Sequence, residues 1–365
     1  MIRIPVKTSS GSYETIIEPG VLSRAGGFLK EVLGGVRPLI IVSVAPVRRR
    51  WGKALVRSLE GAGFAPKLAE MPDGEPWKRL STLEILAEKL LHLGADRRAV
   101  VLAFGGGVVG DLAGMLASIY MRGVKLVHVP TTVQAQLDAS IGGKTGVNLR
   151  AGKNLVGTFY QPQLVLIDPA TLDTLPEREF RAGMYEALKC GIIGRPELFS
   201  RLEHSSLASL REDPEFLTSV LAESVGLKVE VVRGDETEHD HRRVLNLGHT
   251  FGHALEAATG YSRFLHGEAV AWGMQAAARI ALETGLLKPA VHERIAGAIR
   301  AWGRLPEINV ETRRVFRYLK VDKKTEAGVV HFVLPTEIGR VEIRNNVPPG
   351  AIAAAMAEIR QASRR

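Results

Sequence analysis

The chain has 365 residues, of which 45% are hydrophobic and 24% charged, with a formal net charge of +9 and a single cysteine. These proportions are ordinary for a globular protein and exclude a disordered chain, and no apolar run approaches the roughly 18 residues that would indicate a membrane span. A chain of this length exceeds the size at which one hydrophobic core usually stops growing, so we expect two domains that share a ligand-binding cleft.

The excess of positive charge admits two kinds of anionic partner. A nucleic acid is disfavoured, because only 6% of residues are aromatic and short basic runs such as 48–50 contain no aromatic side chain for base stacking. A small anionic metabolite explains the charge equally well. The only thiol, Cys190, cannot form an intrachain disulfide, so we expect a packing residue in a reducing cytoplasm. Any metal ligands should then be histidine and carboxylate.

The first half of the chain alternates apolar, β-branched runs with helical stretches. At the N-terminus, Ile2, Ile4 and Val6 alternate with polar residues, which predicts a strand and not a secretory signal. Such alternation over residues 1–175 predicts an α/β Rossmann-like domain, with a parallel sheet covered by helices on both faces. The further predicted strands lie in PLIIVSVAPV (38–47), AVVLAF (99–104), KLVHVPTT (125–132) and QLVLIDP (163–169).

The pattern changes after about Thr174. From Glu177 to roughly Arg300 the β-branched runs vanish, and Ala, Leu, Glu and Arg recur at helical spacing, with breaks at Gly and Pro. A short β element at 329–344 and a closing Ala-rich helix follow. We therefore expect a second, mainly helical domain over 176–365, with the boundary near Leu175–Pro176.

Glycines follow the predicted strand that ends at Phe104. Gly105, Gly106 and Gly107 would let the backbone approach a pyrophosphate at a helix N-terminus, and Asp111 lies in the first turn of that helix. The spacing departs from the strict G-x-G-x-x-G pattern, and an ordinary strand-to-helix turn explains the glycines equally well. This signal needs support from other loops.

That support comes from loops at the carboxyl ends of other predicted strands, where ligands bind in open α/β sheets. The carboxylates of Asp73 and Glu75 could take ribose hydroxyls, and Thr131 and Thr132 offer hydroxyls after KLVHVP. The alternatives are a plain turn for the 73–78 loop, which also holds Lys78, and a helix cap for the threonines.

A second glycine-rich segment contains Gly-Gly-Lys-Thr at 142–145, after Asp138 and before Lys153. It resembles the end of a P-loop, but the earlier glycine of that motif is absent, which argues against a nucleoside triphosphatase. Lys144 on a glycine hinge still suits an anionic ligand, because its ammonium is a mobile point charge.

The helical half contains three histidines within eighteen positions. His249 and His253 are four apart and so share one helix face, and His266 follows. Glu186, in an apolar helical segment, is a candidate for a carboxylate ligand. It lies three residues before Lys189, and a surface ion pair is the alternative explanation for these two residues. Two histidines and one carboxylate form a catalytic zinc set with an open coordination position.

Further cations lie in the same half, at Lys228, Arg242 and the pair Lys323–Lys324. A solvated helix face is the default explanation for each, since exposed charges usually contribute little. If they belong to a site, they indicate a substrate with phosphate and carboxylate groups. The residues alone thus predict a dinucleotide-dependent and metal-dependent oxidation of an anionic polyol.

Six motifs in this order resemble the 3-dehydroquinate synthases of the sugar phosphate cyclase family, from about residue 73 to 339. They are GGGVVGDLAG, PTT, LDASIGGKTGVN, GKNLVGTFYQP, NLGHTFGHALE and FLHGEAVAWGM. The resemblance implies conversion of 3-deoxy-D-arabino-heptulosonate 7-phosphate to 3-dehydroquinate and phosphate, by oxidation with NAD, phosphate elimination, reduction, ring opening and aldol closure. It also implies one divalent metal ion, zinc or cobalt.

The resemblance further assigns roles to residues. It implies metal ligands at Glu186, His249 and His266, with His253 as a substrate contact, and a homodimer in which Arg122 reaches the neighbouring subunit's phosphate site. The implied NAD contacts are Asp73, Glu75, Lys78, Gly105, Gly106, Gly107, Asp111, Thr131, Thr132, Lys144 and Lys153. The implied catalytic and substrate contacts are Asp138, Lys144, Lys189, Lys228, Glu238, Arg242, Asn246 and His253, with a basic group from Lys323 or Lys324.

Three rival functions remain. A sister cyclase, such as a 2-deoxy-scyllo-inosose or valiolone synthase, would share the NAD and metal sets, but Arg242 with Asn246 and Lys228 fits a carboxylated substrate. A metal-dependent polyol dehydrogenase would accumulate NADH. A nucleic-acid binder is motivated only by the basic charge and would show steeply salt-dependent binding to duplex DNA.

Overall fold

The structure is a computed structural model that describes residues 1–238, 241–322 and 330–364. The chain forms two compact units. The first unit comprises Met1–Leu175 and Pro214–Thr237, and the second comprises Pro176–Asp213 and Glu238–Arg365. The sequence predicted one boundary near Leu175–Pro176. The units divide there too, and the segment 214–237 in addition groups with the first unit.

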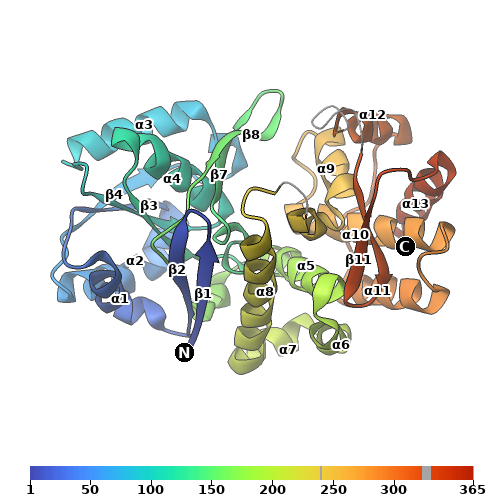
Figure 1. Cartoon of the computed structure of the whole chain (residues 1–365), viewed down its shortest axis with the longest axis horizontal. Helices are drawn as coiled ribbons and strands as arrows, with labels where there is room; N and C mark the ends of the chain where they lie inside the picture. Colours follow the sequence, from blue (N-terminus) through green and yellow to red (C-terminus); the bar gives the residue numbers. More distant parts are fainter. Residues whose placement is uncertain (239–240, 323–329, 365) are drawn as a thin grey trace. The chain divides into compact units, whose positions relative to one another are not determined.

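A sheet forms the centre of the first unit (Figure 1). It has seven strands in the order β1-β2-β9-β6-β5-β3-β4. β1 and β2 pair antiparallel, and the other neighbours pair parallel. The predicted Rossmann-like fold class is therefore confirmed, with an antiparallel strand added at one edge. The strands are β1 (Ile2–Thr8), β2 (Gly11–Ile17), β3 (Leu39–Val44), β4 (Pro66–Met71), β5 (Val100–Gly105), β6 (Lys125–Pro130) and β9 (Leu164–Ile167).

The central strands are buried on both faces, as the continuous apolar run of β3 predicts. Ile40 and Val42 point into a core with α3 and α4, whereas Leu39 and Ile41 point into a core with α1 and α2. Helices therefore cover both faces of the sheet. Their bounds are α1 (Ala25–Leu33), α2 (Ala45–Gly61), α3 (Leu80–His92) and α4 (Gly107–Ile119).

Two further elements of the first unit carry candidate site residues. The strands β7 (Lys144–Leu149) and β8 (Gly152–Phe159) form a separate antiparallel hairpin. Helix α8 (Pro214–Gly234) packs against β1 and against a π-helical turn at Ala135–Ala139. Helical spacing identifies α8 as a helix but says nothing of its partners, which is why the sequence assigned it to the second domain.

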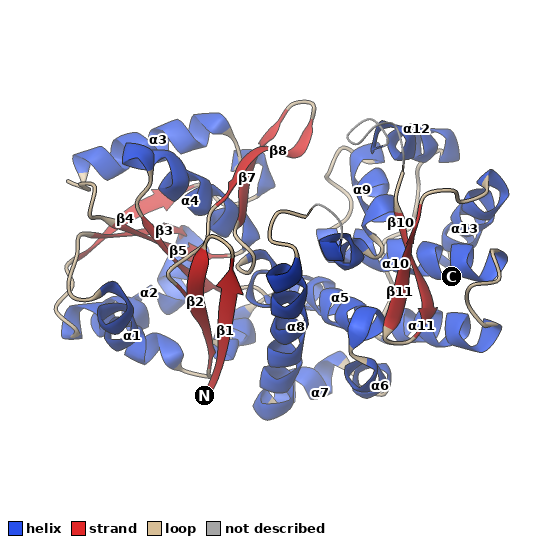
Figure 2. Cartoon of the chain, in the orientation of Figure 1, coloured by secondary structure: helices blue, strands red, loops and turns tan. Residues whose placement is uncertain are grey.

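The second unit is mainly helical, with one hairpin of β10 (Phe332–Glu337) and β11 (Arg340–Arg344) (Figure 2). Its centre is α10, which packs against α5, α9, α11 and α13 and is buried along most of its length. No helix among the described residues is long and apolar enough to cross a membrane. The helices are α5 (Glu177–Gly194), α6 (Pro196–Glu203), α7 (Leu207–Glu212), α9 (His249–Ala258), α10 (His266–Glu283), α11 (Pro289–Ala301), α12 (Thr312–Asp322) and α13 (Pro349–Ala362).

Candidate functional site

The glycine turn of the first unit joins β5 to the N-terminus of α4. Gly106 occupies the N-cap position and no side chain of the described residues caps the helix, so the first N–H groups of the helix are available to an anion. The turn also packs too closely for larger residues. A Cβ on Gly105 would lie 2.6 Å from Val109 Cγ2, and one on Gly106 would lie 3.0 Å from Thr132 Cγ2. These glycines therefore serve both the tight turn and the exposed helix N-terminus.

Beside this turn, predicted cofactor residues from three segments form one polar network. The ammonium of Lys78 is buried, pairs with the carboxylate of Asp111 and donates to Asn154 Oδ1 at 2.5 Å. Burial raises the pKa of Asp111, against the lowering effect of the Lys78 charge. The chain brings these groups together because η2 (Glu75–Trp77), α4 and the β7–β8 hairpin meet here.

Two asparagines complete the network, and the sequence analysis assigned neither of them. Asn148 donates to Glu75 Oε1 at 2.8 Å and accepts from the backbone N–H of Asn154 at 2.9 Å, while Lys153 Nζ lies 3.7 Å from Glu75 Oε1. The sequence indicated these asparagines only through their position, on either side of a short turn between two strands. Of the remaining candidates, Asp73 is exposed in its loop.

The two threonines differ from each other. Thr132 Oγ1 accepts from the backbone N–H of Ala135 at 3.3 Å, which is the helix-cap geometry that the sequence allowed. Thr131 is buried, and its hydroxyl has no hydrogen-bond partner among the described residues. Lys144 begins β7 with an exposed side chain. Thr131 is therefore the threonine whose hydroxyl is left for a ligand.

Lys228 of α8 reaches Asp138 in the π-helical turn. Its ammonium donates to the backbone oxygen of Asp138 at 2.5 Å and pairs with the Asp138 carboxylate. The residue is only 7% exposed. The default expectation of a solvated helix face is therefore wrong for Lys228, because α8 turns this side chain into the first unit.

Three histidines of the second unit converge as the sequence predicted. His249, His253 and His266 each offer one ring nitrogen, and these three atoms lie within 4.8 Å of one another. The rings of His249 and His266 have centroids 5.1 Å apart. Burial, followed by the positive charges of Lys189 and the other two histidines, lowers the pKa of His249 well below its usual value. A neutral His249 has a lone pair available for a metal ion.

Glu186 lies beside this cluster on α5 and is completely buried. Its Oε1 is 3.5 Å from His266 Nε2, and its Oε2 is 2.5 Å from Lys189 Nζ. A surface ion pair between Glu186 and Lys189 is therefore excluded. Neither oxygen of Glu186 accepts a hydrogen bond among the described residues. Lys189 balances part of the buried charge, but neither oxygen uses its hydrogen-bonding capacity within the described chain, so the donor set fits a divalent metal ion.

Glu256 is a member of the cluster that the sequence analysis missed. This buried residue places Oε2 3.2 Å from His266 Nδ1, which leaves Nε2 directed to Glu186. Burial alone would lower the pKa of His266, but the hydrogen bond to Glu256 and the charges of Glu256 and Glu186 raise it. The signal was present in the sequence, since Glu256 is seven residues after His249 and so lies on the same helix face.

Glycines allow the three helices of this cluster to approach closely. A Cβ on Gly267, next to His266, would lie 1.8 Å from the backbone oxygen of Ala182 on α5. A Cβ on Gly273 would lie 1.8 Å from the backbone oxygen of Gly248, which precedes α9. Gly267 therefore permits the close approach of α10 to α5, and Gly273 permits that of α10 to the start of α9.

The remaining second-unit candidates lie before α9. Arg242 is only 1% exposed, so a solvated face is excluded for it as well. Asn246 donates to Glu238 Oε1 at 2.8 Å, and Glu238 has a positive φ of 61°. Lys323 and Lys324 lie outside the described residues.

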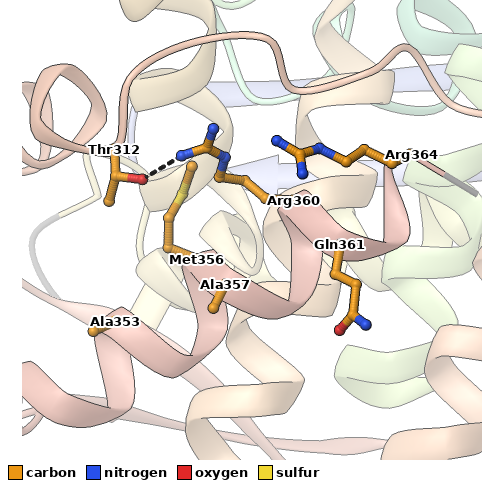
Figure 3. Close-up of a pocket in the computed structure, with 7 residues that line it drawn as sticks. All are labelled: Thr312, Ala353, Met356, Ala357, Arg360, Gln361 and Arg364. Atoms are coloured by element: carbon orange, nitrogen blue, oxygen red, sulfur yellow. Dashed lines mark hydrogen bonds between the residues drawn. The ribbon is translucent and has the colours of Figure 1, made fainter.

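Two other features of the described chain bear on function. Arg122 of the first unit is exposed in the 3-10 turn η3 (Tyr120–Arg122) that follows α4, and both it and Met121 have positive φ, of 69° and 48°. In the second unit, a hollow of about 680 Å³ lies along α13, where Arg360 donates to Thr312 at 2.8 Å (Figure 3). None of the predicted site residues that the structure describes lines this hollow.

Sequence comparisons show which proteins this chain resembles. Two family models match it in succession, 3-dehydroquinate synthase N-terminal over residues 68–182 and 3-dehydroquinate synthase C-terminal over 183–325. A 3-dehydroquinate synthase from Koribacter versatilis is 48% identical over 363 residues, which cover 100% of this chain and 99% of the relative. One from Gloeobacter violaceus is 48% identical over 352 residues, with 95% and 96% covered.

Solved structures give a consistent picture at lower identity. The 2-epi-5-epi-valiolone synthase of Streptomyces hygroscopicus, with NAD⁺ and Zn²⁺ bound, is 32% identical with a TM-score of 0.86, and 99% of each chain is covered. A 2-deoxy-scyllo-inosose synthase complexed with carbaglucose-6-phosphate, NAD⁺ and Co²⁺ is 26% identical with a TM-score of 0.87, again with 99% of each chain covered.

Proposed function

Because this chain belongs to the 3-dehydroquinate synthase family, we propose that it converts 3-deoxy-D-arabino-heptulosonate 7-phosphate to 3-dehydroquinate and phosphate. The observation that carries the proposal is the buried Glu186 carboxylate, which accepts no hydrogen bond from the described residues and lies beside three converging histidines. This arrangement suits a Lewis-acid metal centre with an open position for a substrate oxygen. The products require the carbon–oxygen bond to the phosphate group to break by elimination, so the enzyme is a lyase that cleaves a carbon–oxygen bond and releases phosphate.

We propose Glu186, His249 and His266 as the metal ligands and His253 as a substrate contact. His253 is the exposed member of the cluster, whereas the other two histidines are more enclosed. The relatives with bound Zn²⁺ or Co²⁺ support a divalent ion of this kind. Lys189 holds its ammonium beside Glu186, where it can also stabilise negative charge that develops on a neighbouring substrate oxygen.

We propose that NAD binds in the first unit, with its pyrophosphate at the glycine turn. The two cyclase structures that contain NAD⁺ support this assignment, as does the uncapped N-terminus of α4. When bound, NAD supplies a reversible hydride acceptor and the metal supplies a Lewis acid. Glu75 and Asp111 offer carboxylates to ribose hydroxyls, and Lys78 pairs with the Asp111 carboxylate.

We propose eight residues as substrate contacts. Asp138, Lys144 and Lys228 belong to the first unit, whereas Lys189, Glu238, Arg242, Asn246 and His253 belong to the second. A buried guanidinium such as that of Arg242 suits bidentate recognition of a carboxylate. This choice favours a carboxylated substrate over the uncarboxylated sugar phosphates of the sister cyclases, as does the higher identity to the 3-dehydroquinate synthases.

Phosphate release tests the proposed reaction. Purified protein with Zn²⁺ or Co²⁺ and catalytic NAD should release phosphate from 3-deoxy-D-arabino-heptulosonate 7-phosphate, without net NADH and only in the absence of chelator. Net NADH would indicate a polyol dehydrogenase. If protein that holds metal and NAD releases phosphate only from an uncarboxylated sugar phosphate, the chain is a sister cyclase.

Glu256→Gln tests the support of the metal centre. We expect Zn²⁺ affinity to fall by roughly 10-fold to 100-fold, because carboxylates that orient a ligating histidine contribute about that much. The melting temperature of the metal-free protein should change little. Competition with a fluorescent chelator measures the affinity. Affinity equal to that of the unchanged protein would show that Glu256 does not orient His266.

We also propose a homodimer in which Arg122 serves the partner's phosphate site. Positive φ at two successive non-glycine residues costs about 1–3 kcal/mol each and needs a functional reason, which the outward presentation of Arg122 would supply. Ile119 and Phe159 are exposed apolar side chains in the same part of the first unit, where Tyr160 bonds to Val124. Such apolar exposure suits an interface.

Mixing two inactive variants tests the shared site. Arg122→Ala and Glu186→Ala should each be inactive alone, but their heterodimers contain one site with both residues intact. In a twofold dimer, random exchange should therefore restore about one quarter of the normal phosphate release. If Arg122 serves its own subunit, mixing will restore nothing.

A further inference from the structure

A small pocket lies directly beneath the glycine turn of the first unit. Its lining includes Gly105, Gly106 and Gly107, together with His128 of β6 and Ser140 at the end of the π-helical turn. The centre of a water molecule can occupy about 10 Å³ of this pocket. That is room for roughly one water, which needs two to four polar partners to stay there.

The two polar side chains of this pocket have unused hydrogen-bonding groups. His128 is only 5% exposed, and its ring makes no hydrogen bond among the described residues. Ser140 is 4% exposed, and its hydroxyl is also without a partner there. Buried polar groups of native proteins are nearly always satisfied, by protein or by ordered water. Two such groups on one pocket therefore point to a bound polar molecule.

The surroundings of His128 define which form of the ring is present. Burial lowers the pKa of His128 to about 4, so the imidazole is neutral near pH 7, with one donor nitrogen and one acceptor nitrogen. A Cβ on Gly110 of α4 would lie 3.6 Å from the ring atoms Nδ1 and Cε1, so the ring lies against the first turns of that helix. A neutral ring can hydrogen bond to a water molecule beside an anion, and it does not form an ion pair with that anion.

We propose that His128 and Ser140 hold one ordered water beneath the glycine turn, and that this water hydrogen bonds to the pyrophosphate of the bound dinucleotide. This inference rests on the proposed NAD site and adds two positioning residues to it. The backbone N–H groups at the N-terminus of α4 would hydrogen bond directly to the pyrophosphate. The water would add a further hydrogen bond to it from the pocket. Neither residue would contact the reacting atoms.

The test compares NAD affinity with stability in His128→Leu, Ser140→Ala and the double variant. Each single change should weaken NAD binding about 10-fold, which corresponds to about 1.4 kcal/mol. The double variant should bind no more weakly than the singles, because either change alone already removes the shared water. The melting temperature without NAD should stay the same or rise in His128→Leu, since an unsatisfied buried ring is replaced by an apolar side chain.

Two controls accompany these variants. Thr15 of β2 has a buried hydroxyl without a partner among the described residues and does not line the pocket, so Thr15→Val should leave NAD affinity unchanged. His128→Gln keeps a donor and an acceptor and should retain most of the affinity. If His128→Leu does not fold, Ser140→Ala and His128→Gln still decide the question through their affinities.

The outcomes separate this subsite from the proposed function. If the unchanged protein binds NAD and both Ser140→Ala and His128→Leu bind it equally well, the proposed water subsite is refuted and the proposed function is not. Multiplying losses in the double variant would overturn the shared water, because the two residues would then act independently. Failure of the unchanged protein to bind NAD would overturn the proposed cofactor and the subsite together.

Discussion

Glu186→Ala is expected to abolish stoichiometric metal binding and to lower phosphate release by at least about 100-fold, while the protein stays folded. Loss of a direct ligand should exceed the roughly 10-fold to 100-fold loss that follows removal of a supporting residue. The variant removes a buried carboxylate, but it also frees Lys189 from its partner, so we expect some loss of stability as well. Mass spectrometry measures the loss of metal, and circular dichroism after refolding measures the effect on the fold.

His266→Ala should give the same loss of metal, and Glu358→Ala provides the matched control. Glu358 is a carboxylate of the second unit that accepts hydrogen bonds from His292 and Gln275, away from the three histidines. Its replacement should lower the melting temperature without loss of metal. Full metal content in both Glu186→Ala and His266→Ala would refute this ligand set.

Gly267→Ala should impair the metal centre although it adds only one methyl group. The new Cβ would overlap the backbone oxygen of Ala182 at 1.8 Å, and backbone atoms cannot move aside as a flexible side chain can. Relief requires α10 to move away from α5, which would separate His266 from Glu186. We expect a loss of about 1–3 kcal/mol in unfolding free energy, typical of overpacking, and weaker Zn²⁺ binding.

Gly297→Ala on α11 serves as the control for this prediction. It belongs to the same unit, and a Cβ there would meet no atom within 4 Å. Replacing a helical glycine by alanine should then stabilise the protein by about 0.5–1 kcal/mol and leave Zn²⁺ affinity unchanged. Equal effects of the two substitutions on metal affinity would show that the close contact at Gly267 does not position His266.

The sequence by itself determined the fold class and predicted several of the strands and helices. Continuous β-branched runs identify strands buried on both faces, and the i, i+4 spacing of His249 and His253 determines that they share a helix face. The glycine turn after β5 was likewise readable, because a tight turn at a helix N-terminus restricts residue type locally. Each of these signals depends on residues that are close together in the chain.

Only the tertiary structure decided which charges are buried and which polar groups lack partners. Lys228 and Arg242 look like solvated cations until α8 and the segment before α9 are packed, and Glu186 with Lys189 looks like a surface pair until α10 covers α5. The roles of Glu256 and His128 also depend on contacts between elements distant in sequence. Burial is set by packing from several segments at once, so local spacing cannot specify it.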